Sequence, residues 1–416
     1  MFPFNLLRSF LPFAEKGFFS LPPVETIEID TAHTKPARAL KHLLKLNHGN
    51  YAILWNERKF HNHAPHSLCS AFLLGASADD LNRLYEAESK QLDPWVDSPG
   101  EISTFDWRDF LGKREYERAF VDFFEDELVR RGYDWKKVVF QYLFSGKEPL
   151  FNALTSDLGH PLIHLAYAFE VSSREVAMEA LSLTAVCYGQ PHKYLDDPSY
   201  SKAQPSYTST SPLDILSKVR VDRRLHNLFS TPGDHNFEII FRDAEAVILD
   251  HWNAWRIEPT NAMKAFRESQ ETAVALLTAS LPTTKRSTGD ADAKYDFFFV
   301  HVLTTVHAVR VLLPAIPLKF QIPLLRQWWL MTLAMYIGQL RPQIKLDSVR
   351  KYDVAGKGWE YVTDKALKGN YYTETHYIKA VRALRDMART SGDQDEFYLK
   401  AAVKFSDGFS GWGGFV

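Results

Sequence analysis

The sequence predicts an all-α protein, a single large helical domain over residues 1–416 with few or no strands. Apolar residues recur at helical spacing along most of the chain, whereas strict alternation occurs only in ETIEID at 25–30, which predicts one short strand. There is no repeated strand–helix–strand rhythm and no GxGxxG after a strand, so a doubly wound nucleotide-binding fold is not expected.

Helix signals in the first half of the chain have recognisable ends. Pro36 stands where a first helical turn accepts proline. Ser77 with Asp80, and Ser172 with Glu175, form capping-box patterns that open two further helices. The helices predicted here cover about 36–49, 81–89, 113–131, 159–170 and 176–189.

The second half carries longer apolar-periodic runs, interrupted by polar stretches. The runs predict helices at about 235–256, 260–280, 294–313, 321–340, 373–390 and 394–404. Residues 191–213 are rich in Pro, Ser and Tyr and form a candidate lid loop, and residues 281–293 form an exposed loop. Residues 1–35 are taken as an N-terminal extension of the same domain.

Composition narrows the classes of function. Formal net charge is −2 and no basic face stands out, so nucleic acid is not an expected partner. Two cysteines outside any CxxC pair fit a reducing, cytoplasmic setting. Arg8 interrupts the apolar start, which argues against a signal peptide, and prolines and charges interrupt 311–337, so no membrane span is expected. The sequence leaves the oligomeric state unknown.

Aromatic residues make up 14% of the chain, with 29 Phe, 18 Tyr and 10 Trp. Such a content can build a large core, and it can also wall a cavity for a flat aromatic ligand.

The segment GHPLIHLAYAFE at 159–170 carries the first pair of candidate metal ligands. Pro161 suits the first helical position. His160 and His164 are four residues apart, so their side chains share one helix face and can chelate a metal. No glutamate stands between them as HExxH requires, so a zinc metalloprotease is excluded.

Two further helical segments carry isolated histidines. His301 lies in the very apolar run YDFFFVHVLTTVHAVR, so it is expected to be buried and to need a partner. Thr304 and Thr305 share its face, whereas His307 points elsewhere and is taken as structural. Seven other histidines are also assigned structural roles: His33, His42, His48, His192, His226, His235 and His251.

His376 and Lys379 share a helix face in TETHYIKAVRAL. An ammonium group has no free lone pair, so a lysine that faces a metal must be neutral or covalently changed, for example to a carbamate. His61, His63 and His66 form a compact cluster in NERKFHNHAPH, where they can ligate a metal or act as acid, base or substrate-binding groups.

Together these blocks resemble the questin oxidase-like family of fungal enzymes that act on polyketide anthraquinones, and the resemblance runs from about residue 56 to 385. It implies oxidative opening of the central quinone ring to a benzophenone-type product in secondary metabolism. Some members are described as NADPH-using Baeyer–Villiger-type oxidases. A second description is a dioxygenase with a mononuclear non-haem iron held by histidines and a carboxylated lysine.

The resemblance also implies roles for individual residues, with Fe(2+), O2 and a small aromatic polyketide as the other participants. NADPH would be consumed directly or by a partner reductase. Ser67 stands where the family pattern leads us to expect a second histidine. The implied metal ligands are His160, His164, His301, His376 and the Lys379 carbamate, with His66 as an alternative to His160; the implied catalytic residues are His61 or His63 for proton transfer and Thr304 or Thr305 for oxygen.

Two other classes of function compete with this one. Carbamylated lysine with several histidines also builds metal-dependent hydrolases, usually on (β/α)8 barrels, which the sparse strand signal disfavours. A non-catalytic helical protein with an aromatic pocket would use the same histidines as plain hydrogen-bonding groups.

Overall fold

Helices dominate the computed structural model, which describes residues 17–22, 24–280 and 294–415. Within these residues nineteen α-helices are joined by short 3-10 helices, and four two-residue strands form two small sheets. The predicted all-α class is therefore confirmed. The loop predicted at 281–293, and residues 1–16 of the predicted N-terminal extension, lie outside the described residues.

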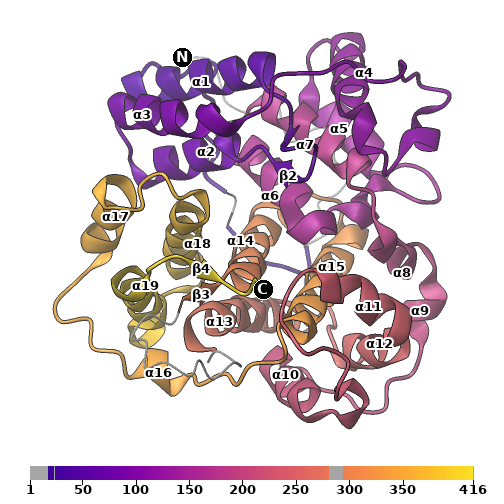
Figure 1. The fold of residues 1–416 in the computed structure, drawn as a ribbon, viewed down its shortest axis with the longest axis vertical. Helices are drawn as coiled ribbons and strands as arrows, with labels where there is room; N and C mark the ends of the chain where they lie inside the picture. Colours follow the sequence, from indigo (N-terminus) through magenta and orange to yellow (C-terminus); the bar gives the residue numbers. More distant parts are fainter. Residues whose placement is uncertain (1–16, 23, 281–293, 416) are drawn as a thin grey trace.

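The elements up to α5, together with α7, gather at one end of the molecule, and α6 leads from them toward its centre (Figure 1). In order these elements are α1 (Lys35–Asn50), β1 (Leu54–Trp55), β2 (Phe60–His61), α2 (Ala64–Leu74), α3 (Ala78–Glu88), η1 (Ser89–Gln91), η2 (Trp107–Phe110), η3 (Arg114–Tyr116), α4 (Glu117–Arg130), α5 (Trp135–Phe144), η4 (Leu150–Ala153), α6 (Ser156–Val171) and α7 (Arg174–Val186).

The second half of the chain supplies the remaining helices and closes the molecule. In order these are η5 (Gln190–His192), α8 (Lys193–Asp196), α9 (Pro198–Lys202), α10 (Pro212–Val221), η6 (Arg223–Leu225), α11 (His235–Asp243), α12 (Glu245–Ala254), α13 (Ala262–Ala279), β3 (Tyr295–Asp296), α14 (Phe297–Leu312), α15 (Leu318–Gly338), α16 (Asp347–Arg350), α17 (Trp359–Lys368), α18 (Thr375–Ser391), η7 (Gln394–Glu396), α19 (Phe397–Gly408) and β4 (Trp412–Gly413).

Capping explains where two of the predicted helices begin. The capping box of α3 is confirmed, because Ser77 and Asp80 each accept a bond from the other's backbone. The second predicted box is wrong by one residue. Ser172 ends α6 in the left-handed conformation (φ 49°), and Ser173 caps α7 by accepting from the amide of Val176.

Three other expectations differ from the structure. Residues 25–30 form no strand, because they lie beside α6 rather than beside another strand, and the Ile27 amide donates to the Glu170 carbonyl (2.8 Å). The candidate lid loop at 191–213 consists largely of short helices, η5, α8, α9 and the start of α10. The run at 235–256 forms two helices, because the chain leaves helical geometry at Ala244 (φ −129°).

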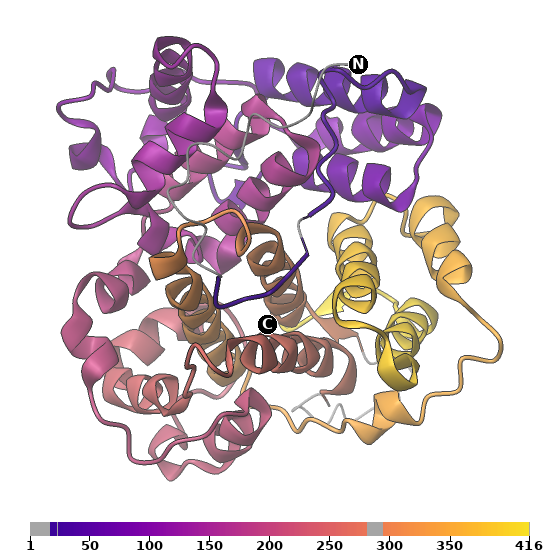
Figure 2. The same ribbon diagram turned by 180° about the vertical axis from the view of Figure 1, so that it is seen from behind.

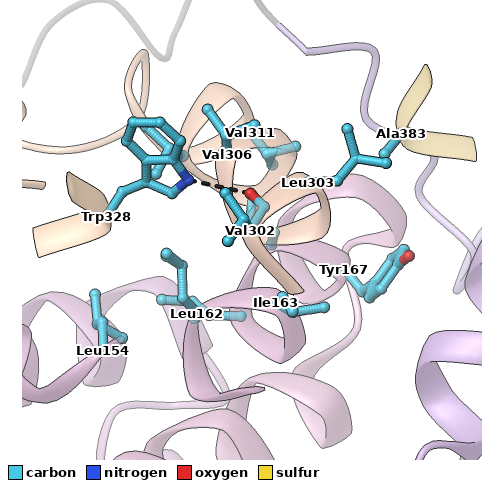
Figure 3. Packing of buried hydrophobic residues seen from close by; sticks show 14 of the residues in the cluster. Leu154, Leu162, Ile163, Tyr167, Val302, Leu303, Val306, Val311, Trp328 and Ala383 are labelled. Atoms are coloured by element: carbon cyan, nitrogen blue, oxygen red, sulfur yellow. Dashed lines mark hydrogen bonds between the residues drawn. The ribbon is translucent and has the colours of Figure 1, made fainter. Parts of the chain in front are cut away.

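The core is organised around α14, which contacts α6, α13, α15 and α18 and lies at the middle of the molecule in both views (Figure 2). Leu162 and Ile163 of α6 lie beside Val302 and Leu303 of α14, and the Trp328 indole of α15 donates to the Val302 carbonyl (3.1 Å; Figure 3). The contacts of α14 with α6 and α18 hold these three helices, which carry candidate site residues, at fixed distances. No helix in the described part of the chain combines the length and the hydropathy needed to cross a membrane.

Candidate metal centre

Four separate elements bring histidines together beside α14. His63 directly precedes α2, His160 lies on α6, and His376 lies on α18; one ring nitrogen from each lies within 4.8 Å of the other two. The ring of His301 on α14 is centred 4.9 Å from that of His160 and 5.0 Å from that of His376. We call these four residues, with Lys379 one turn along α18, the histidine cluster.

The start of α6 is built to bring His160 close to α14. Asp157, Leu158 and Gly159 have positive φ, and regular helix begins only after them, where Pro161 is compatible with a first turn. A Cβ on Gly159 would lie 2.1 Å from the Cγ2 of Thr305, so this close approach of α6 to α14 requires glycine.

The backbone fixes which nitrogen each ring presents. His160 Nδ1 lies 2.5 Å from the Asp157 carbonyl and His301 Nδ1 lies 2.9 Å from the Phe297 carbonyl, so each Nδ1 carries the proton and each Nε2 keeps a lone pair. His63 Nε2 and His160 Nε2 are 2.8 Å apart. Within the described residues, Nε2 of His301 and of His376 are buried without any hydrogen-bond partner. Such convergent, bare imidazole nitrogens fit a cation.

Burial keeps these imidazoles neutral. Desolvation is the largest cause, followed by nearby positive charge, and together they hold the pKa of His63, His160 and His301 well below the ordinary value. The pKa of His376 is lowered to about 4 for the same reasons, with Lys379 as the main charge. Neutral imidazole is the form that binds a metal.

Lys379 is fully enclosed, with 1% of its surface exposed. Its Nζ has no hydrogen-bond partner among the residues that the structure describes, and burial lowers the pKa of this amine to about 7. A substantial fraction of the amine is therefore neutral near neutral pH, and the neutral form is the one that can react with CO2 to give a carbamate.

His164 lies behind the cluster, in a chain of hydrogen bonds. Its Nε2 is 2.7 Å from one Glu179 oxygen, and its Nδ1 is 3.1 Å from His66 Nε2. The other Glu179 oxygen is 2.7 Å from His48 Nδ1, and His48 Nε2 is 2.9 Å from Glu125. Both nitrogens of His164 therefore have partners, so this geometry places His63, rather than His164, among the nitrogens that converge.

Two residues in this chain of hydrogen bonds, His48 and Glu179, were not predicted from the sequence to support the site. Both nitrogens of His48 face carboxylates, so both carry protons; burial opposes this charge, but Glu125 and Glu179 raise the pKa of His48 to about 10. With Glu179 ionised, His164 donates to it and accepts from His66, which leaves His66 Nδ1 as a bare, buried lone pair. No local sequence pattern predicts these partners, because His48 lies on α1 and Glu179 lies on α7.

The other predicted catalytic residues, His61, Thr304 and Thr305, have different surroundings. His61 stacks on His160 with ring centres 3.9 Å apart, and its Nε2 lies 3.4 Å from Asp157. The hydroxyls of Thr304 and Thr305 donate to carbonyls of their own helix, so their hydrogens are already used. Neither residue lines the cavity that opens beside the cluster. Asp157 was also missed, although it stands three residues before His160.

A cavity of about 690 Å³ opens beside the cluster. His61, His63 and His160 form part of its wall, and Pro191 and Leu195 of the candidate lid segment border it. The wall is mostly apolar and includes six phenylalanines: Phe60, Phe237, Phe241, Phe297, Phe298 and Phe415. Its size and aromatic lining suit a flat, multi-ring ligand.

The chain matches the model of the questin oxidase-like family over residues 60–384. It is 26% identical over 376 residues to a Baeyer–Villiger oxidase of Pestalotiopsis microspora, covering 84% of this chain and 81% of that one. It is 24% identical over 365 residues to a questin oxidase of Aspergillus terreus, covering 83% and 79%. The matched range includes every member of the histidine cluster, and the chain belongs to the questin oxidase-like family.

Proposed function

We propose that this protein is an oxidoreductase that opens the central quinone ring of a polyketide anthraquinone to a benzophenone-type product, using O2 and a non-haem iron(II). The observation that carries the proposal is the set of bare imidazole nitrogens beside an apolar cavity of about 690 Å³. The names of relatives as questin oxidase and Baeyer–Villiger oxidase support the substrate class and the type of bond cleavage.

The residues that would hold the iron are His63, His160, His301 and His376, each through Nε2, with Lys379 as a carbamate. Imidazole with one carboxylate-type oxygen suits Fe(II), which would supply O2 binding and one-electron chemistry when bound. His66 Nδ1 is the alternative nitrogen donor. His164 and Glu179 act behind it by fixing which nitrogen of His66 carries the proton.

The cavity wall holds and prepares the substrate. The phenylalanine faces pack against the rings and exclude water. His61 takes a proton from a phenol of the reduced anthraquinone at Nδ1, because its Nε2 lies 3.4 Å from Asp157, and that carboxylate stabilises the imidazolium that results. Arg114 pairs with Asp157 and keeps that carboxylate ionised and in place.

The overall reaction balances without a further reductant at the oxygen step. Reduction of one O2 needs four electrons: the reduced anthraquinone gives two, and cleavage of the carbon–carbon bond gives two. One oxygen atom ends in the new carboxylic acid and the other in the new phenol. NADPH, used directly or by a partner reductase, makes the reduced anthraquinone.

The relatives' names favour a second candidate, a Baeyer–Villiger-type oxidation at the same cavity. NADPH would be the reductant of this route. Here one oxygen atom comes from O2, and the lactone formed is opened by water. A hydrolase with carbamylated lysine is the third candidate, although the described chain contains only two-residue strands and no (β/α)8 barrel.

Isotope labelling separates the three candidates. The iron-reconstituted protein would be incubated with a reduced polyhydroxyanthraquinone under 18O2, and the ring-opened product analysed by mass spectrometry. We expect two labelled oxygen atoms per product. One labelled atom would support the Baeyer–Villiger route. Ring opening of undiminished rate without O2 would eliminate both oxidative routes, and zinc-dependent turnover would then support hydrolysis.

A further inference from the structure

Gln327 of α15 is a buried glutamine whose side chain is bonded at one end only. Its Nε2 donates to the Phe151 carbonyl (3.0 Å), so the nitrogen end of the amide is held by the protein. Its Oε1 is buried without a hydrogen-bond partner among the residues that the structure describes, and the residue is 1% exposed. An unpaired buried acceptor is costly, so this oxygen favours a ligand that brings a donor.

A second glutamine of the same helix shows the contrast. Gln321 is also buried, but its Nε2 donates to the Leu313 carbonyl (2.9 Å) and its Oε1 accepts from the Phe18 amide (3.2 Å). Gln321 lies outside the cavity wall, whereas Gln327 is part of it. Of these two buried glutamines, the one with the unpaired oxygen is thus the one that lines the cavity.

Gln327 stands at one end of an apolar strip of the cavity wall. The other residues that α15 contributes to this wall are Leu330, Met331, Ala334 and Met335. Within the described wall, Ser156 is the other side chain with a buried, unpartnered polar atom, and its hydroxyl can either donate or accept. The Oε1 of Gln327 can only accept, so it selects for a donor.

Helical spacing places Gln327 beyond the histidine cluster along the same wall. A Cβ on Gly159, the residue before His160, would lie 3.4 Å from the Sδ of Met331. Gln327 precedes Met331 by one turn of α15, about 5.4 Å along the helix axis. A flat ligand whose central ring lies beside His160 can therefore extend an outer ring along α15 toward Gln327.

We propose that Gln327 is a specificity-determining residue, which accepts through Oε1 a hydrogen bond from a hydroxyl at the outer edge of the substrate's terminal ring. The inference rests on the proposed function for the class of substrate, a polyhydroxyanthraquinone, and adds which hydroxyl group the cavity recognises. An acceptor in a dry wall rejects a ligand that lacks the donor, because the buried oxygen is then left unpaired.

The chemistry of the ligand decides which hydroxyl this is. A hydroxyl next to a quinone carbonyl donates to that carbonyl within the ligand itself, so its hydrogen is already used. A hydroxyl at position 3 of an anthraquinone has no such internal acceptor and lies at the outer edge of the ring. Its O–H is free to donate to Gln327, and methylation of that oxygen removes the donor.

The test is a binding titration of the full chain by equilibrium dialysis, at a pH low enough to keep the ligand hydroxyl protonated. Three oxidised anthraquinones are the probes: 1,8-dihydroxyanthraquinone, its 3-hydroxy derivative and its 3-methoxy derivative. Gln327→Leu and Gln327→Met remove the acceptor with little change of volume, and Gln321→Leu is the matched control on the same helix. Circular dichroism would establish which variants are folded.

For the wild type and the control, we expect the 3-hydroxy probe to bind at least about 10-fold more tightly than the other two, which corresponds to about 1.4 kcal/mol. In the Gln327 variants this preference should fall below about 3-fold, because the 3-hydroxy probe alone binds more weakly. A purely structural role would weaken the binding of all three probes equally, and that result would overturn the proposal. A preference that survives in the Gln327 variants would overturn it as well.

Failure of this inference and failure of the proposed function give different results. Equal affinity of the wild type for the three probes would overturn the role of Gln327 and leave ring opening untouched. A wild type that shows the preference for the 3-hydroxy probe, loses it in the Gln327 variants and opens no ring would support Gln327 and contradict the proposed reaction.

Discussion

Two clusters of buried ionisable side chains share three helices, and they are built in opposite ways. The histidine cluster occupies one level of α6, α14 and α18, and His63 joins it from the residue before α2. About two to three turns further along the same helices is a second group, which we call the ion-pair cluster: Glu170, His307, Arg382 and Asp386.

His301 and His307 show the difference most directly, because both are buried on α14. His307 Nδ1 lies 3.3 Å from Asp386 and its Nε2 lies 3.7 Å from Glu170. Burial alone would lower the pKa of His307, but these carboxylates raise it. Among the residues that the structure describes, His301 has no such neighbour, and its pKa is held well below the usual value. Carboxylates favour the protonated form of one buried histidine, and the other, which lacks them among the described residues, is held neutral.

The largest expected effect comes from His301→Leu. Turnover should fall by more than about 100-fold, since even residues behind the ligands typically contribute about 10- to 100-fold. Iron bound after reconstitution, measured by elemental analysis, should fall with it. His307→Gln is the matched control on the same helix, and its folded fraction should keep wild-type turnover. If His301→Leu keeps its iron and its activity, the two histidines do not differ in the way described.

For the free energy of unfolding of the metal-free protein, we expect the larger loss from a substitution of His307 rather than of His301. His307→Leu leaves Glu170 and Asp386 short of a partner and is expected to cost about 3 kcal/mol, the low end for a broken buried pair because Arg382 still contacts both carboxylates. His301→Leu should cost less than about 1.5 kcal/mol, as a swap of similar volume that removes an unpartnered nitrogen. Urea unfolding gives both values, and an equal loss in both variants would contradict the contrast.

Glu179→Gln tests whether a carboxylate can matter behind the histidine cluster. A glutamine amide has one acceptor oxygen and no charge, so it cannot accept from both His164 and His48 as the carboxylate does. The proton of His66 is then no longer fixed on one ring nitrogen. We expect a loss of about 10-fold in iron affinity or turnover. Asp126→Asn, an exposed change close by on α4, serves as the control. An unchanged iron affinity in Glu179→Gln would place the chain of hydrogen bonds outside the function.

The smallest effect is a pH dependence that belongs to the ion-pair cluster. The pKa of His307 is raised in the folded state, so its contribution is fully present below the unfolded pKa of about 6.5 and is lost as pH rises through the folded value. The difference in unfolding free energy between wild type and His307→Gln should therefore shrink as pH rises above about 6.5. A difference that grows over that range would show that His307 is not held as a cation.

The sequence predicted what depends on neighbours along one helix. The pairing of His376 with Lys379, the start of α6 near Pro161 and the burial of His301 all follow from local spacing and apolar surroundings. The distinction between His63 and His164 could not be predicted in this way. It depends on Glu179 and on His48, which is 116 residues away from His164, and such partners become neighbours only when α1, α6 and α7 pack.

The bare imidazole nitrogens also bear on how a preparation of this protein behaves. Nitrogen-rich sites follow the Irving–Williams order, in which Cu(II), Ni(II) and Zn(II) all outcompete Fe(II). At the proposed iron site, protein made in cells rich in zinc, or purified on an immobilised nickel column, is expected to acquire a metal chosen by supply and affinity. A test of the proposal therefore needs chelator treatment followed by anaerobic iron loading, and metal content has to be compared with turnover.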